Sequence, residues 1–392
     1  MDISNDLISS VYGRHPARAM SFDDVRRGLQ EAVRAQNVVI SREEGLEQYI
    51  YTNGCRFENR WDLFSLLARG LILDPVSRRV LATPFPKFFN FGEVITRLPD
   101  EPFEVTEKID GSLGIIFEHN EQWRVATKGR ITSEQALWAT DFLRQKIDMR
   151  KLVGGTTYLV EIVYPRNRIV IPYNFEALFL LGGYDESGRE LMRSELDRLA
   201  SETGFRLVPS HTYGSLPELL PVARQLPRDR EGFVVRFHSG LRIKLKGEQY
   251  CRIHKLISGC TPLSIWEAMM NGEDLDRLRV ELPEEMTRDF DLIRRLLGAR
   301  LEALVTEVRL AVDQNAHLPD KQVGFLIQAP NNGLTAAQRK FLFMARKARF
   351  FEEVRVAGDS RRKAFMLFRP DRNDLPGYSP SDALTRFSEE SG

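Results

Sequence analysis

The chain has 392 residues, of which 42% are hydrophobic, 10% aromatic and 28% charged. These proportions are those of a folded globular protein and exclude a disordered, collagen-like or coiled-coil chain as a whole. The net charge is only +1, so binding to a polyanion would require cations concentrated at one place. A single hydrophobic core seldom extends over so many residues, and we therefore expect two domains.

The start of the chain and its cysteines indicate where the protein works. The first ten residues, MDISNDLISS, lack the basic and apolar regions of a signal peptide, and no stretch approaches the roughly 18 apolar residues of a membrane span. We therefore expect a cytoplasmic protein without a membrane segment. Cys55, Cys251 and Cys260 show no spacing typical of zinc sites and are interpreted as buried or incidental thiols.

In chain order, the first predicted element is a helix over residues 21–36, and short alternating runs typical of strands follow over residues 38–245. Helices are predicted between them at 133–147, 193–202 and 216–225. Strands joined by turn signals with interposed helices indicate an α+β domain built on antiparallel sheets. The predicted strands are Tyr49 to Thr52, Gly70 to Leu73, Phe103 to Thr106, Leu113 to Phe117, Trp123 to Thr127, Tyr158 to Val163, Leu178 to Leu181 and Phe233 to Phe237.

Beyond Gly259 the pattern becomes helical throughout. One apolar stripe recurs at steps of three and four residues, at Ile293, Leu296, Leu297, Leu301, Leu304 and Val308. We therefore expect the α+β domain to occupy residues 1–259 and an all-α domain to occupy residues 260–392. The tail from about residue 371 is rich in Ser, Pro, Asp and Gly and is expected to be loosely ordered.

The sharpest local motif is Lys108-Ile109-Asp110-Gly111-Ser112, which lies between two predicted strands. By itself the motif also fits a hairpin turn, because Asp-Gly is a strong turn dipeptide. A second basic motif, Arg242-Ile243-Lys244-Leu245-Lys246, follows Glu231-Gly232. Alternation along a strand places its three cations on one face, which suits either a bound polyphosphate or a solvated edge strand.

Together the two motifs suggest that Lys108 is a nucleophile. A free lysine is protonated at neutral pH, and we expect burial and the charges of Lys244 and Lys246 to lower the pKa of Lys108 and release its lone pair. The same lysines would neutralise a phosphate under attack. Glu161 and Glu231 are expected to hold the magnesium ion that such chemistry requires.

The order of K-x-D-G, a distant E-G-h-V and K-x-K resembles that of the covalent lysyl nucleotidyltransferases, which comprise DNA ligases, RNA capping enzymes and RNA ligases. Leu113 stands where DNA ligases and capping enzymes usually carry arginine, so the motif is closer to the RNA ligases. Further segments narrow the resemblance to the phage T4 RNA ligase 1 family, from about Tyr49 to His254. These segments are Arg69-Gly70, Pro86 to Asn90 with Glu93, Thr127 to Leu137, Glu161 with Pro165 to Val170, and Lys244, Lys246, Tyr250 and His254.

This resemblance implies a nucleotidyltransferase (ligase adenylation) domain and a three-step reaction with ATP. Lys108 would attack the α-phosphorus of ATP and form lysyl-AMP. The AMP would pass to an RNA 5′-phosphate, and an RNA 3′-hydroxyl would then displace AMP. The implied metal is Mg²⁺, for which Mn²⁺ can substitute.

The resemblance also implies roles for individual residues. Arg69, Lys87 and Lys128 would contact phosphates or ribose, and Lys244 and Lys246 would stabilise charge on the α-phosphate. Glu161 and Glu231 would contact ribose or the metal. Asp110 and Gly111 would complete the nucleotide site, and Phe89 or Tyr250 would pack on the nucleoside. Two alternatives stay open: core packing for Phe88, Phe89 and Phe91, and a structural hydrogen bond for His254.

A basic run in the last third of the chain carries a second question. It comprises Arg339, Lys340, Arg346, Lys347, Arg349, Arg355, Arg361, Arg362, Lys363 and Arg369, interleaved with Phe341, Phe343, Phe350, Phe351, Phe365 and Phe368. Such a run suits an RNA-docking surface. It equally suits amphipathic helices with a phenylalanine core and solvated arginines.

We therefore expect an ATP-dependent RNA ligase that joins 3′-hydroxyl and 5′-phosphate ends in RNA repair, with nicked tRNA as one candidate substrate. Other ends would need a separate kinase or phosphatase. The alternatives are a non-catalytic RNA- or nucleotide-binding protein of the same fold, a DNA ligase and a capping guanylyltransferase.

Overall fold

The computed structural model describes residues 7, 11, 13–93, 98–330, 332–347, 349–356, 358–381 and 384. The start of the chain, apart from Leu7, thus lies outside the described part. The chain divides into two compact units, one ending at Arg252 and one beginning at Ile253. The division falls inside helix α9 (Glu248–Ser258), at whose end we placed the expected boundary. No helix among the described residues is both long and apolar enough to cross a membrane.

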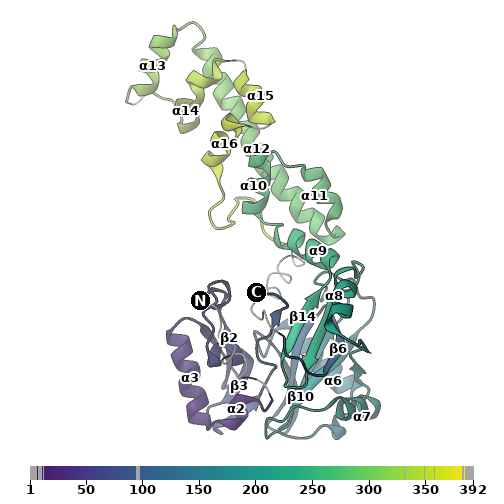
Figure 1. Cartoon of the computed structure of the whole chain (residues 1–392). Coiled ribbons are helices and arrows are strands. Elements are labelled where there is room, and N and C mark those ends of the chain that lie inside the picture. Colours follow the sequence, from purple (N-terminus) through teal and green to yellow (C-terminus); the bar gives the residue numbers. More distant parts are fainter. Residues whose placement is uncertain are drawn as a thin grey trace. The chain divides into compact units, whose positions relative to one another are not determined.

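The N-terminal unit begins with helices that cover a four-stranded sheet (Figure 1). The strand order is β1 (Val38–Glu43), β2 (Leu46–Tyr51), β3 (Arg69–Asp74) and β4 (Arg79–Ala82). Helices α2 (Pro16–Ala19) and α3 (Phe22–Arg34) precede it, and α4 (Asn53–Phe57) and α5 (Leu63–Leu67) connect β2 to β3. Ser21 caps α3 by accepting a hydrogen bond from the Asp24 amide. Val25, Leu29 and Ala32 of α3 are buried in the core that α3 shares with the sheet.

Two five-stranded sheets follow. One has the order β11 (Arg206–Leu207), β10 (Ala177–Tyr184), β9 (Thr157–Val163), β7 (Ser112–His119) and β8 (Gln122–Thr127). The other has the order β12 (Ser210–His211), β6 (Phe103–Lys108), β13 (Gly232–Phe237), β14 (Arg242–Lys246) and β5 (Phe89–Asn90). Helices α6 (Glu134–Lys146), α7 (Arg193–Thr203) and α8 (Leu216–Arg224) lie between strands in the sequence. Most neighbouring strands pair antiparallel, so the predicted α+β fold class is confirmed.

The register of the second sheet brings the two basic motifs together. Gly232 lies opposite Lys108 in β6 and opposite Lys246 in β14. Glycine is required there, because a Cβ at Gly232 would lie 2.0 Å from the carbonyl oxygen of Leu245. Gly111 is equally constrained, since its Cβ would lie 2.5 Å from the Ile162 carbonyl oxygen. Both glycines thus permit the close backbone contacts on which the site is built.

The C-terminal unit is helical, as predicted. Its helices are α10 (Pro262–Asn271), α11 (Leu275–Glu281), α12 (Glu284–Gln314), α13 (Asp320–Gln328), α14 (Ala336–Ala345), α15 (Arg349–Arg355) and α16 (Asp359–Phe365). The predicted apolar stripe lies on α12, where five of its six residues are buried and Leu296 is half-buried.

Three residues of the described part of the tail are buried or hydrogen-bonded to the helical unit. Leu375 is buried, the Tyr378 hydroxyl donates to Asp289 over 3.0 Å, and the Ser381 amide donates to the same carboxylate over 2.9 Å. These contacts fix single residues between 371 and 381, most of which are exposed, and the loose order of the tail stays a prediction. The rest of the predicted tail lies outside the described residues, apart from residue 384.

Candidate active site

Lys108 and Lys246 are bound to the two oxygens of one buried carboxylate. Nζ of Lys108 lies 2.8 Å from Oε2 of Glu231, and Nζ of Lys246 lies 2.9 Å from Oε1. The Glu231 side chain is only 3% exposed. The sheet register places Lys108 and Lys246 on either side of Gly232, so the residue before Gly232 reaches both.

The electrostatics of the Lys108 ammonium differ from our expectation. Burial lowers its pKa, but the negative charges of Glu231 and Glu161 outweigh burial, and the pKa lies above its usual value. The predicted lowering by Lys244 and Lys246 is therefore wrong for the protein without nucleotide. Burial raises the pKa of Glu231, but Lys108 and Lys246 reverse this effect and hold the pKa below its usual value. The pair is thus an ammonium on an ionised carboxylate.

Four further predicted cations lie against aromatic rings. Lys87 Nζ is 5.0 Å from the ring centre of Phe89, 5.7 Å from Trp61 and 5.8 Å from Tyr51. Lys128 Nζ is 5.6 Å from Tyr51. Such contacts hold a cation in place while leaving its charge available to an anion.

The ring of Phe88 contacts the other two cations, Arg69 and Lys244. Arg69 Cζ lies 5.1 Å and Lys244 Nζ 4.6 Å from the centre of its ring. Nη1 of Arg69 is buried and has no hydrogen-bond partner among the described residues. A buried donor without an acceptor is rare in proteins, so this guanidinium is suited to an anionic ligand.

Burial and neighbouring positive charges lower the pKa values of two lysines in the site. Burial, together with Arg69, lowers the pKa of Lys87 to about 8. Burial and the charges of Lys87 and Arg69 hold the pKa of Lys244 well below its usual value. Neighbouring positive charges thus lower the pKa values of these lysines, and the negative charge of a polyphosphate would raise them again. The residues present therefore fit a nucleoside triphosphate.

Asp110 serves the protein rather than an open site. Its Oδ2 accepts hydrogen bonds from the amides of Val170 and Ile171 over 2.9 and 2.7 Å, and its Oδ1 accepts from the Tyr250 hydroxyl over 2.7 Å. Tyr250 is 2% exposed, and its ring lies 5.1 Å from Lys246 Nζ. Phe89 is also 2% exposed and packs on Trp61. These two rings are thus occupied by the protein, and their contact with a nucleoside stays a prediction.

The two predicted metal ligands lie near Lys108. Glu161 contributes to the raised pKa of Lys108 as Glu231 does. Its Cγ lies 3.0 Å from the ideal Cβ position of Gly111. No three side chains of His, Cys, Asp or Glu cluster as a ready-made metal site within the described ranges. Two carboxylates nevertheless fit Mg²⁺, which commonly takes one or two carboxylates and completes its shell with substrate phosphates and water.

Arg242 does not join the lysines. Its guanidinium bonds to Glu190, which also binds Arg236 over 2.9 Å, and it lies 4.1 Å from the ring of Phe85. The expected face of three cations is therefore a pair, Lys244 and Lys246. Ile243 and Leu245 are buried as alternation predicts. Sequence reasoning missed Trp61 and the role of Phe88, and only the adjacency of Phe88 to Lys87 could have indicated it.

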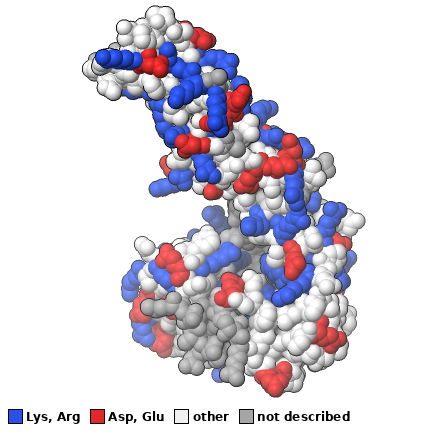
Figure 2. Space-filling view, turned by 45° about the horizontal axis from the view of Figure 1, so that its top comes forward, with Lys and Arg blue, Asp and Glu red and all other residues white. Residues whose placement is uncertain are grey.

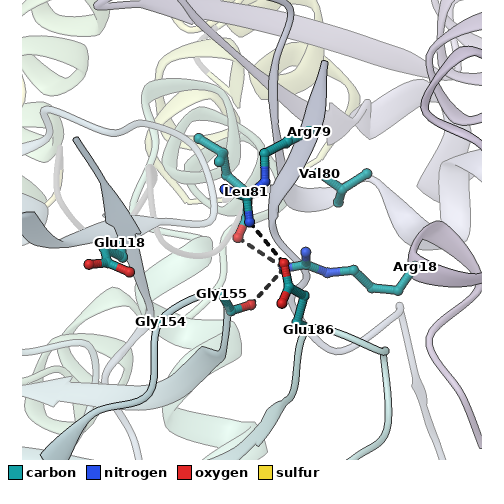
Figure 3. A pocket seen from close by; sticks show the side chains of 8 residues that line it. All are labelled: Arg18, Arg79, Val80, Leu81, Glu118, Gly154, Gly155 and Glu186. Atoms are coloured by element: carbon teal, nitrogen blue, oxygen red, sulfur yellow. Dashed lines mark hydrogen bonds and ion pairs between the residues drawn. The ribbon is translucent and has the colours of Figure 1, made fainter. Parts of the chain in front are cut away.

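A separate small pocket, of about 170 Å³, is lined by a different set of residues (Figure 3). Arg18 donates to the carbonyls of Leu81 and Gly155 there, and Arg79 pairs with Glu186 over 2.9 Å. None of the predicted site residues lines this pocket. Nε of Arg18 is buried there and has no hydrogen-bond partner among the described residues.

Four of the ten cations in the basic run of the C-terminal unit have a described carboxylate partner. Arg346 binds Asp320, Arg349 binds Glu353, Arg355 binds Glu302 and Lys363 binds Asp359. Phe341, Phe350 and Phe365 are buried, whereas Phe343 is 44% exposed. Blue and red side chains are accordingly interspersed over these helices in Figure 2. His254 lies near Ser258 one turn on, at 3.4 Å. These contacts favour amphipathic helices, and RNA docking stays a prediction.

In sequence, this chain is similar to proteins named as RNA ligases. Residues 67–250 match the model of a family described as RNA ligase. The chain is 24% identical over 318 residues to an RNA ligase of Rhodothermus phage RM378, with 62% of this chain and 72% of the relative covered. It is 27% identical over 243 residues to a protein of Autographa californica nuclear polyhedrosis virus named as a bifunctional polynucleotide kinase/RNA ligase. That match covers 54% of this chain and 34% of the viral protein. An archaeal ATP-dependent RNA ligase structure aligns with a TM-score of 0.47 at 15% identity, covering 73% of this chain and 83% of that one.

Proposed function

We propose that the chain is an RNA ligase of the family whose model matches residues 67–250, and that it joins RNA 3′-hydroxyl and 5′-phosphate ends at the expense of ATP. The observation that carries the proposal is the placement of Lys108 and Lys246 on Glu231, beside further cations that lie against aromatic rings. A nucleophile with a ready counter-ion thus lies at a site with surplus positive charge.

In the first step Lys108 Nζ attacks the α-phosphorus of ATP. The N–P bond of lysyl-AMP forms, and the bond to pyrophosphate breaks. The ammonium must first lose a proton, and Glu231 Oε2, at 2.8 Å, is an acceptor within reach. Lys246 stays on the other oxygen and limits the charge change at the carboxylate. Arg69, Lys87, Lys128 and Lys244 bind phosphate oxygens, and Lys244 stabilises charge that develops on the α-phosphate.

The later steps use the same cations. A 5′-phosphate oxygen of RNA displaces Lys108 and takes the AMP, and a 3′-hydroxyl oxygen then displaces AMP to form the phosphodiester. Glu161 and Glu231 would hold Mg²⁺ or Mn²⁺, which supplies charge neutralisation at the phosphates. Asp110 and Gly111 support the nucleotide site by fixing the nucleophile turn, and Phe89 and Tyr250 support it by packing behind the cations.

The proposal also covers the natural substrate and the place where the protein works. Nicked RNA, with nicked tRNA as one candidate, presents the two ends in proximity. The printed name of the viral relative pairs kinase and ligase activities, and this supports a separate end-healing kinase or phosphatase for the present chain. The three cysteines form no disulfide, which fits a reducing, cytoplasmic setting.

The test is incubation of the protein and Mg²⁺ with α-labelled ATP, GTP or NAD, followed by denaturing gel. Label from ATP alone, absent in Lys108→Ala and present in the exposed-lysine control Lys151→Ala, supports lysyl-AMP. Label from GTP indicates a capping enzyme, and label from NAD a DNA ligase of the NAD type. Binding of ATP without label from any nucleotide contradicts the proposal and favours a non-catalytic binding protein.

A further inference from the structure

The segment between β9 and β10 is basic and lies at the nucleophile turn. Residues 164–176, between the two strands, contain Arg166 and Arg168 and a single acidic residue, Glu176, which directly precedes β10. Arg166 is exposed and Arg168 half-buried, whereas Asn167, Val170 and Ile171 are buried. The segment therefore presents the cationic side chain of Arg166 to solvent, and buried residues on either side, Tyr164 and Asn167, hold it in place.

The first half of this segment is fixed to the nucleophile motif through Asn167. Its side-chain amide donates to Ser112 Oγ and to the Ile162 carbonyl, each over 2.9 Å. Tyr164 stacks on Trp138, with ring centres 4.2 Å apart and planes at 20°. The chain direction on both sides of Arg166 is thus determined by buried contacts.

The second half is fixed through Asp110. The Val170 and Ile171 amides donate to its Oδ2, and the Asp110 amide in turn donates to the Tyr173 hydroxyl over 3.3 Å. The Arg168 guanidinium Nε donates to the Val170 carbonyl over 3.1 Å, which holds the start of its side chain within the segment. Asp110 and Ser112 of the nucleophile motif therefore both serve to hold this basic segment.

We propose that Arg166 and Arg168 bind the terminal 5′-phosphate of the RNA that receives AMP from Lys108. The inference rests on the proposed function and assigns its second step to residues outside the ATP site. Anchoring to Asp110 and Ser112 holds the backbone beside both arginines against the nucleophile motif. Guanidinium groups suit a terminal phosphate dianion because they bind two of its oxygens at once.

The transfer of AMP exchanges the P–N bond of lysyl-AMP for a P–O bond to RNA. One oxygen of the RNA 5′-phosphate attacks the phosphorus of lysyl-AMP, the P–N bond breaks, and Lys108 Nζ leaves as an amine that takes up a proton. The product carries a pyrophosphate linkage between AMP and RNA. The arginines offset the repulsion between the two approaching phosphates and orient the attacking oxygen.

The experiment separates the two steps by single-turnover kinetics. Lysyl-AMP formation and AMP transfer from the purified lysyl-AMP protein to a 5′-phosphorylated oligoribonucleotide are measured for wild type, Arg166→Ala, Arg168→Lys and the double variant Arg166→Ala/Arg168→Ala. Arg198→Ala, at an exposed site on α7, is the matched control. Melting temperature reports folding, and Arg166→Ala tests the proposal even if changes at Arg168 disturb the segment.

We expect lysyl-AMP formation within about two-fold of wild type and AMP transfer slower by about 10- to 100-fold in the Arg166 and double variants. The dissociation constant for 5′-phosphorylated RNA should rise, while that for 5′-hydroxyl RNA should not. Transfer at the wild-type rate, or equal losses in both steps, would overturn the inference. A wild-type protein that never acquires label from ATP would instead refute the proposed function.

Discussion

Lys108 and Lys246 are bound by the same carboxylate, one on each oxygen of Glu231. Neither lysine is adjacent to Glu231 in the sequence, and the register of β6, β13 and β14 alone brings the three side chains together. The carboxylate both raises the pKa of Lys108 and fixes its position, and these two effects have opposite consequences for the rate of lysyl-AMP formation.

Glu231→Gln separates the two effects. Without the charge, the pKa of Lys108 falls and more free amine exists at neutral pH, but the amine loses its alignment. We expect alignment to dominate and lysyl-AMP formation to slow by about 100-fold or more, with the free energy of unfolding lowered by roughly 3 kcal/mol, as for other broken buried pairs. Rapid quench at pH 7 measures the rate. A variant that forms lysyl-AMP faster would show that Glu231 affects the rate mainly by raising the pKa of Lys108.

The cations of the site predict proton uptake when ATP binds. The pKa of Lys87 is about 8, so Lys87 is partly neutral around pH 8 without ligand, and the pKa of Lys244 is held well below its usual value. Phosphate charges favour the ammonium forms, and ATP affinity should decline as pH rises through 8. Calorimetry in buffers of different ionisation enthalpy measures the uptake, which Lys87→Met should reduce. Proton release on binding is the contrary result.

Phe88 should contribute to ATP affinity without touching the nucleotide. Its ring lies within 5.1 Å of Arg69 and 4.6 Å of Lys244, and each cation–π contact is worth about 0.5–1 kcal/mol. Phe88→Leu keeps apolar bulk but removes the ring, so the dissociation constant for ATP should rise roughly five-fold or more. Phe88→Tyr keeps the ring and should bind ATP as wild type does. Equal affinities of the Leu and Tyr variants would rule out the ring contact.

Tyr250→Phe should destabilise the N-terminal unit. The substitution removes the 2.7 Å hydrogen bond to buried Asp110 and leaves a carboxylate oxygen with less stabilisation, at a cost of about 1–3 kcal/mol in the free energy of unfolding. Urea denaturation measures the loss. Tyr158→Phe, which removes a neutral hydrogen bond to the Val153 amide, is the matched control and should cost less. A cost no larger than that of the control would indicate that Asp110 is satisfied without Tyr250.

Sequence patterns predicted the strands that carry the site because these strands are long enough to alternate. The helices α3, α6, α7 and α8 were likewise predicted to within a few residues. Strands β5, which carries Phe89, β11 and β12 were missed, since two residues show no periodicity, and the four-residue strand β4 was missed as well. Strand β1 was missed because Val38-Val39-Ile40-Ser41-Arg42-Glu43 does not alternate.

The sequence predicted which residues form the site better than it predicted how their charges interact. The cations near Lys108 could be counted in the sequence, but the orientation of Glu231 toward Lys108 depends on the sheet register and could not. Arg242 was assigned to the basic face because its partner Glu190 is 52 residues away in the chain. The position of an ion pair in a sheet is thus less predictable than the face on which each member lies.

The contacts around Gly111 and Gly232 determine how the chain can vary. Neither residue has a side chain that could take part in a reaction, yet each adjoins one that the site requires, Asp110 or Glu231. At both positions a neighbouring carbonyl oxygen occupies the space of a Cβ, 2.5 Å away at Gly111 and 2.0 Å away at Gly232. A screen of all substitutions scored by activity alone would therefore rank both glycines with Lys108. A parallel measurement of protein abundance would distinguish them, because substitutions there remove the fold around the site and Lys108→Ala removes only the nucleophile.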